Sequence, residues 1–268
     1  MVTTVNQGVA PGPKGPGVTT PVLVVTELGK RYGGVQAVDG ISLTLGAGVR
    51  MGVIGPNGAG KTTLFKMIAG DVPATTGTVE LFGTDVTTMS TARRSRMGVG
   101  RTFQISNLFN EMSVLDNVRV SARGGTPKAR IFWAPQSTKD DVYERSMHAL
   151  ESVGLADRRH DTVADLSHGE QRQLEFAMAL VSDPKILLLD EPAAGLSSAE
   201  RATLKELIEA LPRTLPILLI EHDMSLALGL TDVVMCMENG RHVTTGTPDE
   251  VRDNEKVKEI YLGRRGKK

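Results

Sequence analysis

The chain has 268 residues, and its 31 Lys and Arg balance 31 Asp and Glu, so its formal net charge is zero. At about 150 residues per domain, this length predicts one large domain or one domain with a subdomain. Zero net charge argues against bulk electrostatic binding to nucleic acid or anionic lipid, and an aromatic content of 4% argues against a base-stacking surface. We therefore expect no nucleic-acid partner.

The sequence also lacks the marks of a membrane-spanning or exported chain. It contains no run of 18 apolar residues, and its first residues have neither the basic nor the apolar region of a signal peptide. The lone cysteine, Cys236, excludes an internal disulfide, favours a reducing compartment and has the apolar neighbours of a buried residue. Any role at a membrane is therefore expected to depend on a partner.

The first hundred residues are expected to form a tail followed by strands around a helix. Residues 1–21 are rich in Gly and Pro and predict a disordered tail. Val35–Leu45 alternates with turn residues at Asp39 and Gly40, which predicts antiparallel strands. The other elements predicted here are strands at Val49–Ile54, Gly77–Phe82 and Met97–Gln104 and a helix at Gly60–Ala69.

The middle of the chain, from about residue 105 to 180, is expected to be a helical subdomain, because strand-like runs disappear there. Asp116 and Asn117 are expected helix caps. Residues 119–140 contain Gly and Pro residues with an excess of basic residues, and they predict a loop-rich insertion. A solvated loop without a partner is one interpretation of this insertion, and Ile131–Trp133 within it is expected to form a local core.

In the last third, buried strands alternate with helices, which predicts an α/β fold. The chain ends in a short basic tail at residues 264–268. The predicted elements are strands at Lys185–Asp190, Pro216–Glu221, Val233–Met237 and Arg241–Thr245, helices at Ala199–Leu211 and Met224–Leu230, and two short closing helices.

A phosphate-binding loop gives the strongest single signal. Gly55–Thr62 matches G-x-x-x-x-G-K-[ST] in full, follows an apolar strand and opens a helix. Glycines in such a loop let backbone N–H groups approach phosphate oxygens, and the helix start adds partial positive charge. Lys61 is expected to reach the β- and γ-phosphates, and Thr62 to ligate Mg²⁺. The residues predicted to bind the nucleotide here are Gly55, Pro56, Asn57, Gly58, Ala59, Gly60, Lys61, Thr62 and Thr63.

Polar residues follow two later strands. Asp190 and Glu191 come directly after Ile186–Leu189, which predicts that Asp190 lies beside the Mg²⁺ and that Glu191 polarises the attacking water as general base. His222 follows the apolar run Ile217–Ile220, separated from it by one acidic residue. Ligands bind outside the carboxyl ends of parallel strands. We therefore expect His222 to contact the γ-phosphate.

Two further signals are weaker by themselves. Gln104 ends the predicted strand after Arg101, and its amide is available to bind Mg²⁺ or the attacking water and to report nucleotide state to the helical segment. Ser167 in Leu166–Gln171 is expected to cap a helix whose start, with Gly169, offers a free hydroxyl and amides to an anion.

Together, the order of these motifs resembles that of the nucleotide-binding subunits of ABC transporters, over residues 22–263. The resemblance implies a P-loop NTPase core with an antiparallel β subdomain and an inserted α-helical subdomain. It implies a head-to-tail dimer that holds two ATP molecules, with Ser167, Gly169 and Glu170 serving the nucleotide of the partner's loop. It also implies that Tyr32 stacks on adenine.

A closer resemblance is to the ATP-binding subunit of branched-chain amino acid importers. It is carried by Gly100–Gln104, Met112–Val118, Glu191–Leu196, Ile220–Met224 and the ending Val257–Gly263. It implies ATP hydrolysis that powers uptake of branched-chain or related hydrophobic amino acids, with ATP and Mg²⁺ as cofactors. The implied partners are membrane permease subunits, a second ATPase subunit, identical or different, and an external binding protein, which place the chain on the cytoplasmic face of the membrane.

The sequence departs from the family pattern at three positions: His168 replaces a Gly, Glu170 a frequent Gln, and Ser197 a usual Asp. The first two alter the surface offered to the partner's ATP, and the third removes a carboxylate that helps couple the two sites. Alternatives remain open for the function: an importer of urea or amides, a lipopolysaccharide exporter, or a non-hydrolysing regulator. A soluble ABC ATPase of translation or DNA repair is disfavoured, because the chain has one ATPase unit and no sustained heptads.

Overall fold

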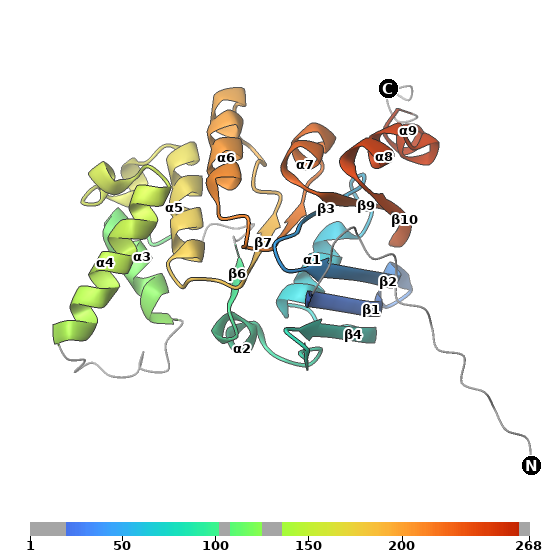
Figure 1. Cartoon of the computed structure of the whole chain (residues 1–268), viewed down its shortest axis with the longest axis horizontal. Helices are drawn as coiled ribbons and strands as arrows, with labels where there is room; N and C mark the ends of the chain where they lie inside the picture. The colour runs from blue at the N-terminus through green and yellow to red at the C-terminus, as the bar shows by residue number, and fades with distance from the viewer. Residues whose placement is uncertain (1–19, 102–107, 125–135, 263–268) are drawn as a thin grey trace, which may run out of the picture.

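The computed structural model describes residues 20–101, 108–124 and 136–262, which form two β-sheets and a set of surrounding helices (Figure 1). The tail predicted at residues 1–21 falls almost wholly outside the described residues, as does the basic tail at 264–268. Within the described ranges, no helix has the length and hydrophobicity needed to cross a membrane.

The smaller sheet is antiparallel and has the strand order β2-β1-β4-β5. Its longest pair is β1 (Pro21–Tyr32) with β2 (Val35–Gly46), joined by a tight turn, and β4 (Thr76–Leu81) and β5 (Thr84–Asp85) extend it. The prediction of several strands within Val35–Leu45 is wrong, because β2 is continuous. Shifts in its register with β1 absorb the irregularity around Gly40, whose φ is 63°.

The larger sheet has the order β10-β9-β3-β8-β7-β6, and only its edge strand β10 is antiparallel to its neighbour. Its inner strands are apolar runs covered on both faces, as parallel sheets require. The predicted strands of the last third are confirmed to within one or two residues. The strands are β3 (Arg50–Ile54), β6 (Val99–Arg101), β7 (Ile186–Asp190), β8 (Ile217–Ile220), β9 (Val233–Glu238) and β10 (Arg241–Gly246).

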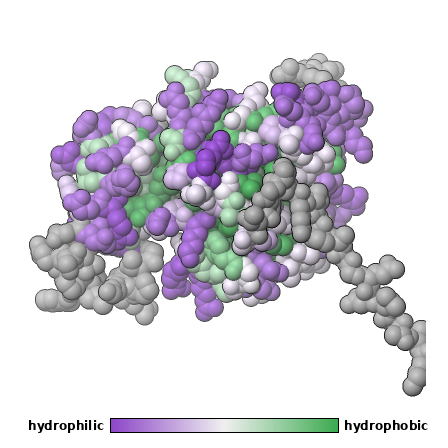
Figure 2. Space-filling view, viewed as in Figure 1, coloured by the Kyte–Doolittle hydropathy of each residue, from purple (hydrophilic) through white to green (hydrophobic). Residues whose placement is uncertain are grey.

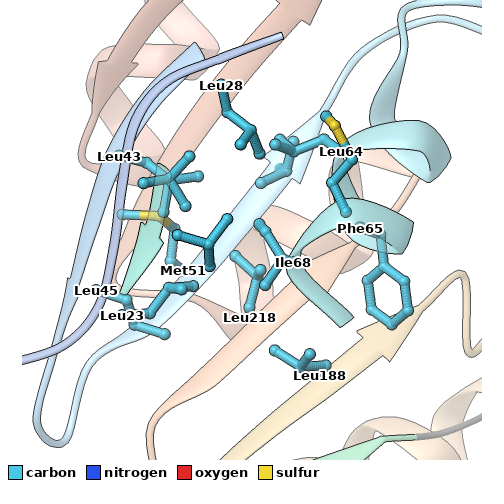
Figure 3. Close-up of a cluster of buried hydrophobic side chains, with 14 of the residues drawn as sticks. Leu23, Leu28, Leu43, Leu45, Met51, Leu64, Phe65, Ile68, Leu188 and Leu218 are labelled. Carbon is cyan, nitrogen blue, oxygen red and sulfur yellow. The ribbon is translucent and has the colours of Figure 1, made fainter. Parts of the chain in front are cut away.

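Helix α1 (Lys61–Ala69) joins the two sheets through the main hydrophobic core, which Figure 3 shows in close-up. Leu64 and Ile68 of the helix lie between Leu28 and Leu218, residues that belong to different sheets, and all four are fully buried. Because α1 begins immediately after the phosphate loop, this packing fixes the loop relative to both sheets.

Helices α3 (Val114–Gly124), α4 (Gln136–Ser152) and α5 (His168–Leu180) lie together at one end of the molecule (Figure 1). The predicted caps Asp116 and Asn117 lie inside α3 instead, because the hydroxyl of Ser113 accepts the hydrogen bond from the Asp116 N–H at 3.1 Å. The loop predicted at 119–140 is shorter than expected: residues 119–124 belong to α3 and 136–140 to α4, and Ile131–Trp133 lies outside the described residues.

The remaining helices flank the larger sheet: α2 (Thr91–Arg96), α6 (Ser198–Ala210), α7 (Met224–Leu230), α8 (Pro248–Asp253) and α9 (Glu255–Leu262). Val251 and Val257 of the last two pack in one cluster with Ile54 and Cys236, so the chain end covers the sheet beside the phosphate loop. Cys236 is buried, as predicted. The outer surface of α8 and α9 is mostly hydrophilic (Figure 2).

Candidate functional site

The strand order of the larger sheet brings three loops together at one edge. Strand β8 lies between β3 and β7, and its last residue, Ile220, is in register with both Val53 and Asp190. The backbone N–H of Glu191 donates to the carbonyl of Ile220 at 2.8 Å, and that of Glu221 to the carbonyl of Val53 at 3.2 Å. The phosphate loop, the Asp190–Glu191 pair and the Glu221–His222 pair are therefore neighbours, at the carboxyl edge where α/β sheets bind ligands.

A cavity of about 480 Å³ opens at this edge. The first residues of β2 and the turn at Asn239 close it. Polar side chains and loop backbone line it together, which suits a polar ligand. The lining residues are Val35, Gln36, Ala37, Asn57, Gly58, Ala59, Gly60, Lys61, Thr62, Thr63, Glu191 and Asn239.

The phosphate loop has the conformation that its glycines permit. Gly58 and Gly60 have φ values of 82° and 94°, in the region that side-chain-bearing residues avoid. A Cβ on Gly60 would lie 2.3 Å from the carbonyl oxygen of Ala37, whereas one on Gly58 would meet no atom within 4 Å. Gly60 therefore permits close packing against β2, and Gly58 leaves the floor of the cavity open.

Lys61 is held by its own loop. Its Nζ donates to the carbonyl of Gly55 at 2.8 Å and to that of Pro56 at 3.2 Å, and the residue is only 4% exposed. Burial lowers its pKa, and the carboxylates of Glu191 and Asp190 oppose that effect. Neutral carbonyls compensate an ammonium less well than anionic oxygens do, so the site favours an anion that replaces them.

Asp190 is a buried carboxylate without a partner for one of its oxygens. The residue is 4% exposed, and Oδ1 has no hydrogen-bond donor among the described residues. Burial first, and then the charge of Glu191, raise the pKa of Asp190 to about 6. An orphaned buried carboxylate oxygen beside a hydroxyl-bearing loop is the chemistry that a hard cation such as Mg²⁺ requires.

Glu191 and His222 face each other across two loops. The Nδ1 of His222 lies 3.7 Å from Oε2 of Glu191, and the imidazole is 45% exposed. Glu191 has a φ of 47°, a left-handed conformation that is uncommon outside glycine and turns its side chain into the cavity. The pair thus combines a potential proton acceptor with a solvent-accessible imidazole.

Sequence reasoning missed Glu221 as a functional residue, although it lies beside His222 at the end of an apolar strand. Its side chain is fully buried, and its Oε2 lies 3.8 Å from Nδ1 of His222. Burial raises the pKa of Glu221, against the backbone donors that stabilise its charge. A carboxylate directly after a buried strand was the available signal.

The remaining predicted nucleotide contacts are less complete. Tyr32 is 48% exposed and does not line the cavity, although its neighbour across the turn, Val35, does. The Nζ of Lys30 lies 5.0 Å from the Tyr32 ring centre, a cation–π contact with one face of the ring. Gln104 lies outside the described residues.

The start of α5 is separate from this cavity. Ser167, Gly169 and Glu170 line a second cavity of about 270 Å³ against α6. The Ser167 hydroxyl oxygen accepts from the Glu170 N–H at 3.3 Å, which leaves its O–H to donate elsewhere, while the Glu170 carboxylate accepts from the Ser167 N–H at 2.8 Å and from Arg158 at 2.5 Å. This capping box satisfies donors that were expected to meet an anion.

The same device explains Ser197. Its hydroxyl caps α6 in a capping box with Glu200, and a Cβ on Gly169 would lie 2.7 Å from Oε1 of Glu200. The carboxylate of Glu200 therefore lies against the start of α5. The starts of α5 and α6 therefore contact each other within one chain.

No cluster of three or more His, Cys, Asp or Glu side chains suited to a metal exists in the described parts of the chain. The orphaned Asp190 oxygen and the cavity-lining hydroxyl of Thr62 instead suit a cation that takes its other ligands from phosphate and water.

Two protein families match this chain. Residues 38–194 match the family described as ABC transporter, and residues 241–267 match the branched-chain amino acid ATP-binding cassette transporter family. The first match spans the phosphate loop, the start of α5 and the Asp190–Glu191 pair. The second covers the chain end that packs beside the phosphate loop.

Known relatives agree with these matches. The chain is 39% identical to the high-affinity branched-chain amino acid transport ATP-binding protein LivG of Salmonella typhimurium and 37% identical to BraF of Pseudomonas aeruginosa, each over 92% of this chain and 99% of the relative. The solved ADP conformation of MJ1267, an ATP-binding cassette of an ABC transporter, superposes with a TM-score of 0.80 at 30% identity, covering 91% of this chain and all of that one.

Proposed function

The chain belongs to the ABC transporter ATP-binding family, and from that membership we propose that it is the ATP-hydrolysing subunit of an importer of branched-chain or related hydrophobic amino acids. Its ATPase activity follows from the family, and the substrate class rests on similarity to LivG and BraF and on the match at its C-terminal segment. The observation that carries the proposal is the joining of three loops, with Lys61, Asp190 and Glu191, at one edge of the parallel sheet.

For the nucleotide, we propose that the phosphates occupy the cavity over Gly58 and replace the carbonyls that now hold Lys61. Tyr32 supplies the stacking face for adenine. Mg²⁺ bound by Thr62, Asp190 and Gln104 would neutralise charge that develops on the phosphate oxygens.

For the chemistry, we propose that Glu191 accepts a proton from the attacking water. The water oxygen forms a bond to the γ-phosphorus as the bond to the β-phosphate oxygen breaks, and ADP leaves. His222 donates a hydrogen bond to the γ-phosphate from its position 3.7 Å from Glu191. These residues mainly position the reactants and stabilise charge.

For the assembly, we propose that ABC ATPase units pair head to tail, so that Ser167, Gly169 and Glu170 complete the site of a second ATPase subunit, identical or different. Closing of the pair on two ATP molecules moves the α3–α5 region and the membrane permease subunits bound to it. An external binding protein delivers the amino acid, and the ATPase lies on the cytoplasmic face of the membrane.

The test is ATP hydrolysis by the full chain assembled with its permease subunits, with Glu191→Gln as variant. The variant is expected to bind ATP but to hydrolyse it about 10²–10⁴-fold more slowly, because general-base catalysis contributes that much. The control is Glu206→Gln, an exposed residue of α6. Unchanged hydrolysis by Glu191→Gln would refute the general-base role. Hydrolysis stimulated by leucine-loaded binding protein supports the substrate class, and stimulation by urea or amides alone contradicts it.

A further inference from the structure

Glu221 is a carboxylate that no solvent reaches, at the centre of the loops that carry Glu191 and His222. Its side chain is 0% exposed. One oxygen, Oε1, accepts from the Ala193 N–H at 3.2 Å, and the other, Oε2, accepts from the His222 N–H at 3.2 Å. A longer contact of 3.5 Å joins Oε2 to the Asp223 N–H. Each oxygen thus anchors a different loop.

Burying a carboxylate at this position costs desolvation free energy, which hydrogen bonds from the surrounding backbone must offset. Desolvation raises the pKa of Glu221, and the N–H groups of Ala193, Asp223 and His222 act against that rise. An apolar side chain at the end of β8 would pack without this cost, but it would leave those N–H groups without their acceptor. The residue therefore suits the joining of two loops better than the filling of a core.

The loop held by Oε1 is the one that sets the conformation of Glu191. Glu191 has a φ of 47°, and the next residue, Pro192, has no N–H to donate. The Ala193 N–H is therefore the first backbone donor after Glu191 that an acceptor can hold, and Glu221 is that acceptor. On the other side, the Glu191 N–H is held by the Ile220 carbonyl at 2.8 Å. Ile220, the last residue of β8, and Glu221, which follows it, thus hold the turn from both sides.

The loop held by Oε2 carries the imidazole. Nδ1 of His222 lies 3.8 Å from Oε2 of Glu221 and 3.7 Å from Oε2 of Glu191. The same Glu221 oxygen anchors the His222 backbone at 3.2 Å, so this carboxylate fixes the position of the residue and lies close to its ring.

We propose that Glu221 is a positioning residue that fixes Glu191 and His222 relative to each other for ATP hydrolysis, without contacting the nucleotide. The inference rests on the proposed function, in which those two residues contact the attacking water and the γ-phosphate. Glu221 lies outside the phosphate loop and outside the cavity lining. Its loss is therefore expected to reduce turnover and to leave ATP binding intact.

The kinetic test compares Glu221→Ala, Glu221→Gln and the exposed control Glu206→Ala in the assembled full-length complex. We expect Glu221→Ala to lower kcat by about 10–100-fold with KM for ATP within about 3-fold, because small misplacement of reacting groups costs up to 10²-fold. Gln keeps one acceptor oxygen and thus one anchored loop, so its loss is expected to be smaller. An unchanged kcat, or a loss that appears only in KM, overturns the proposal.

A second measurement separates positioning from general destabilisation and from failure of the proposed function. Amide hydrogen exchange of the full chain, without nucleotide, is expected to rise in Glu221→Ala at both residues 191–194 and 221–224, and in Glu221→Gln at one of these two segments, while exchange in the α8 segment stays unchanged. Exchange that rises everywhere, or at neither loop, contradicts a joining role. If the unmodified complex hydrolyses no ATP, the proposed function fails, and exchange alone still decides whether Glu221 joins the loops. If Glu221→Ala does not fold, Glu221→Gln carries both measurements.

Discussion

The edge of the parallel sheet and the start of α5 both present polar groups that sequence motifs assign to ATP, but they are prepared in opposite ways. At the sheet edge, Asp190 is buried with an unpartnered oxygen, and Lys61 is buried against neutral carbonyls. At α5, the exposed Ser167 and the half-buried Glu170 satisfy each other in a capping box, and Arg158 neutralises Glu170.

The difference shows which surface has an energetic need for a ligand. Buried charged groups without full compensation are stabilised when an ion of opposite charge binds, so the sheet edge is suited to bind nucleotide and cation within a single chain. A capping box is stable alone, so the start of α5 gains little from a free nucleotide and suits a ligand presented by another subunit. Variants at the sheet edge should therefore change nucleotide binding by the single chain, whereas variants at the start of α5 should change only hydrolysis by the assembled pair.

The largest effect is expected for Lys61→Ala at the sheet edge. If the Lys61 ammonium bonds the phosphates as we propose, its loss should weaken ATP binding by about 100-fold, since a charge-assisted hydrogen bond contributes roughly 1.5–3 kcal/mol. Calorimetric titration of the full chain with ATP measures it. The exposed Lys205→Ala on α6 serves as control and should bind ATP normally. Equal affinity of Lys61→Ala and the unmodified chain for ATP would refute the assignment of the phosphate loop to the nucleotide site.

A smaller effect is expected on stability from Asp190→Asn. Burial raises the pKa of Asp190 from 3.8 to about 6 in the folded chain. Between about pH 4 and 6 the folded state therefore binds more protons than the unfolded state, and the free energy of unfolding falls as pH rises. Above that window the full cost of the buried charge is present, and Asn removes it.

Without Mg²⁺ and ATP, Asp190→Asn should therefore be more stable than the unmodified chain at pH 7.5, by about 1–3 kcal/mol, and the gain should vanish near pH 4. Urea unfolding at several pH values measures this, with the exposed Asp157→Asn as control. Addition of Mg²⁺ and ATP should stabilise the unmodified chain more than the variant. A variant that is less stable at pH 7.5 would show that Asp190 is compensated within the chain.

Local patterns in the sequence predicted the sheet edge well, because each part of it is one strand and the residues that follow it. The apolar runs before Gly55, Asp190 and His222 place these residues at strand ends, and parallel pairing brings the ends together. The fold class and most strand bounds follow from the same alternation of buried strands and helices.

Features that depend on contacts between distant residues could not be predicted from the sequence. Strand β1 was not identified, because its pairing with β2 and β4 and not its own pattern defines it. Ser113, and not Asp116 or Asn117, caps the helix, because it is an equally good acceptor placed just before the first helical residue. Glu221 reads as a solvated strand end, and only the packing of the neighbouring loops shows that it is buried.

The smallest effect separates the two regions most sharply. Ser167→Ala removes a cap, so it should cost about 1 kcal/mol, or about 3 °C in Tm, as should Thr247→Ala in the equivalent capping box of α8. ATP binding by the single chain should be unchanged in both variants, because neither residue touches the phosphate-loop cavity. In the assembled ATPase pair, however, only Ser167→Ala should slow hydrolysis, by about 10-fold, since we propose that the Ser167 hydroxyl, and not that of Thr247, contacts the partner's nucleotide. Equal hydrolysis by the two variants would mean that the start of α5 is a structural cap alone, and that the sheet edge works without it.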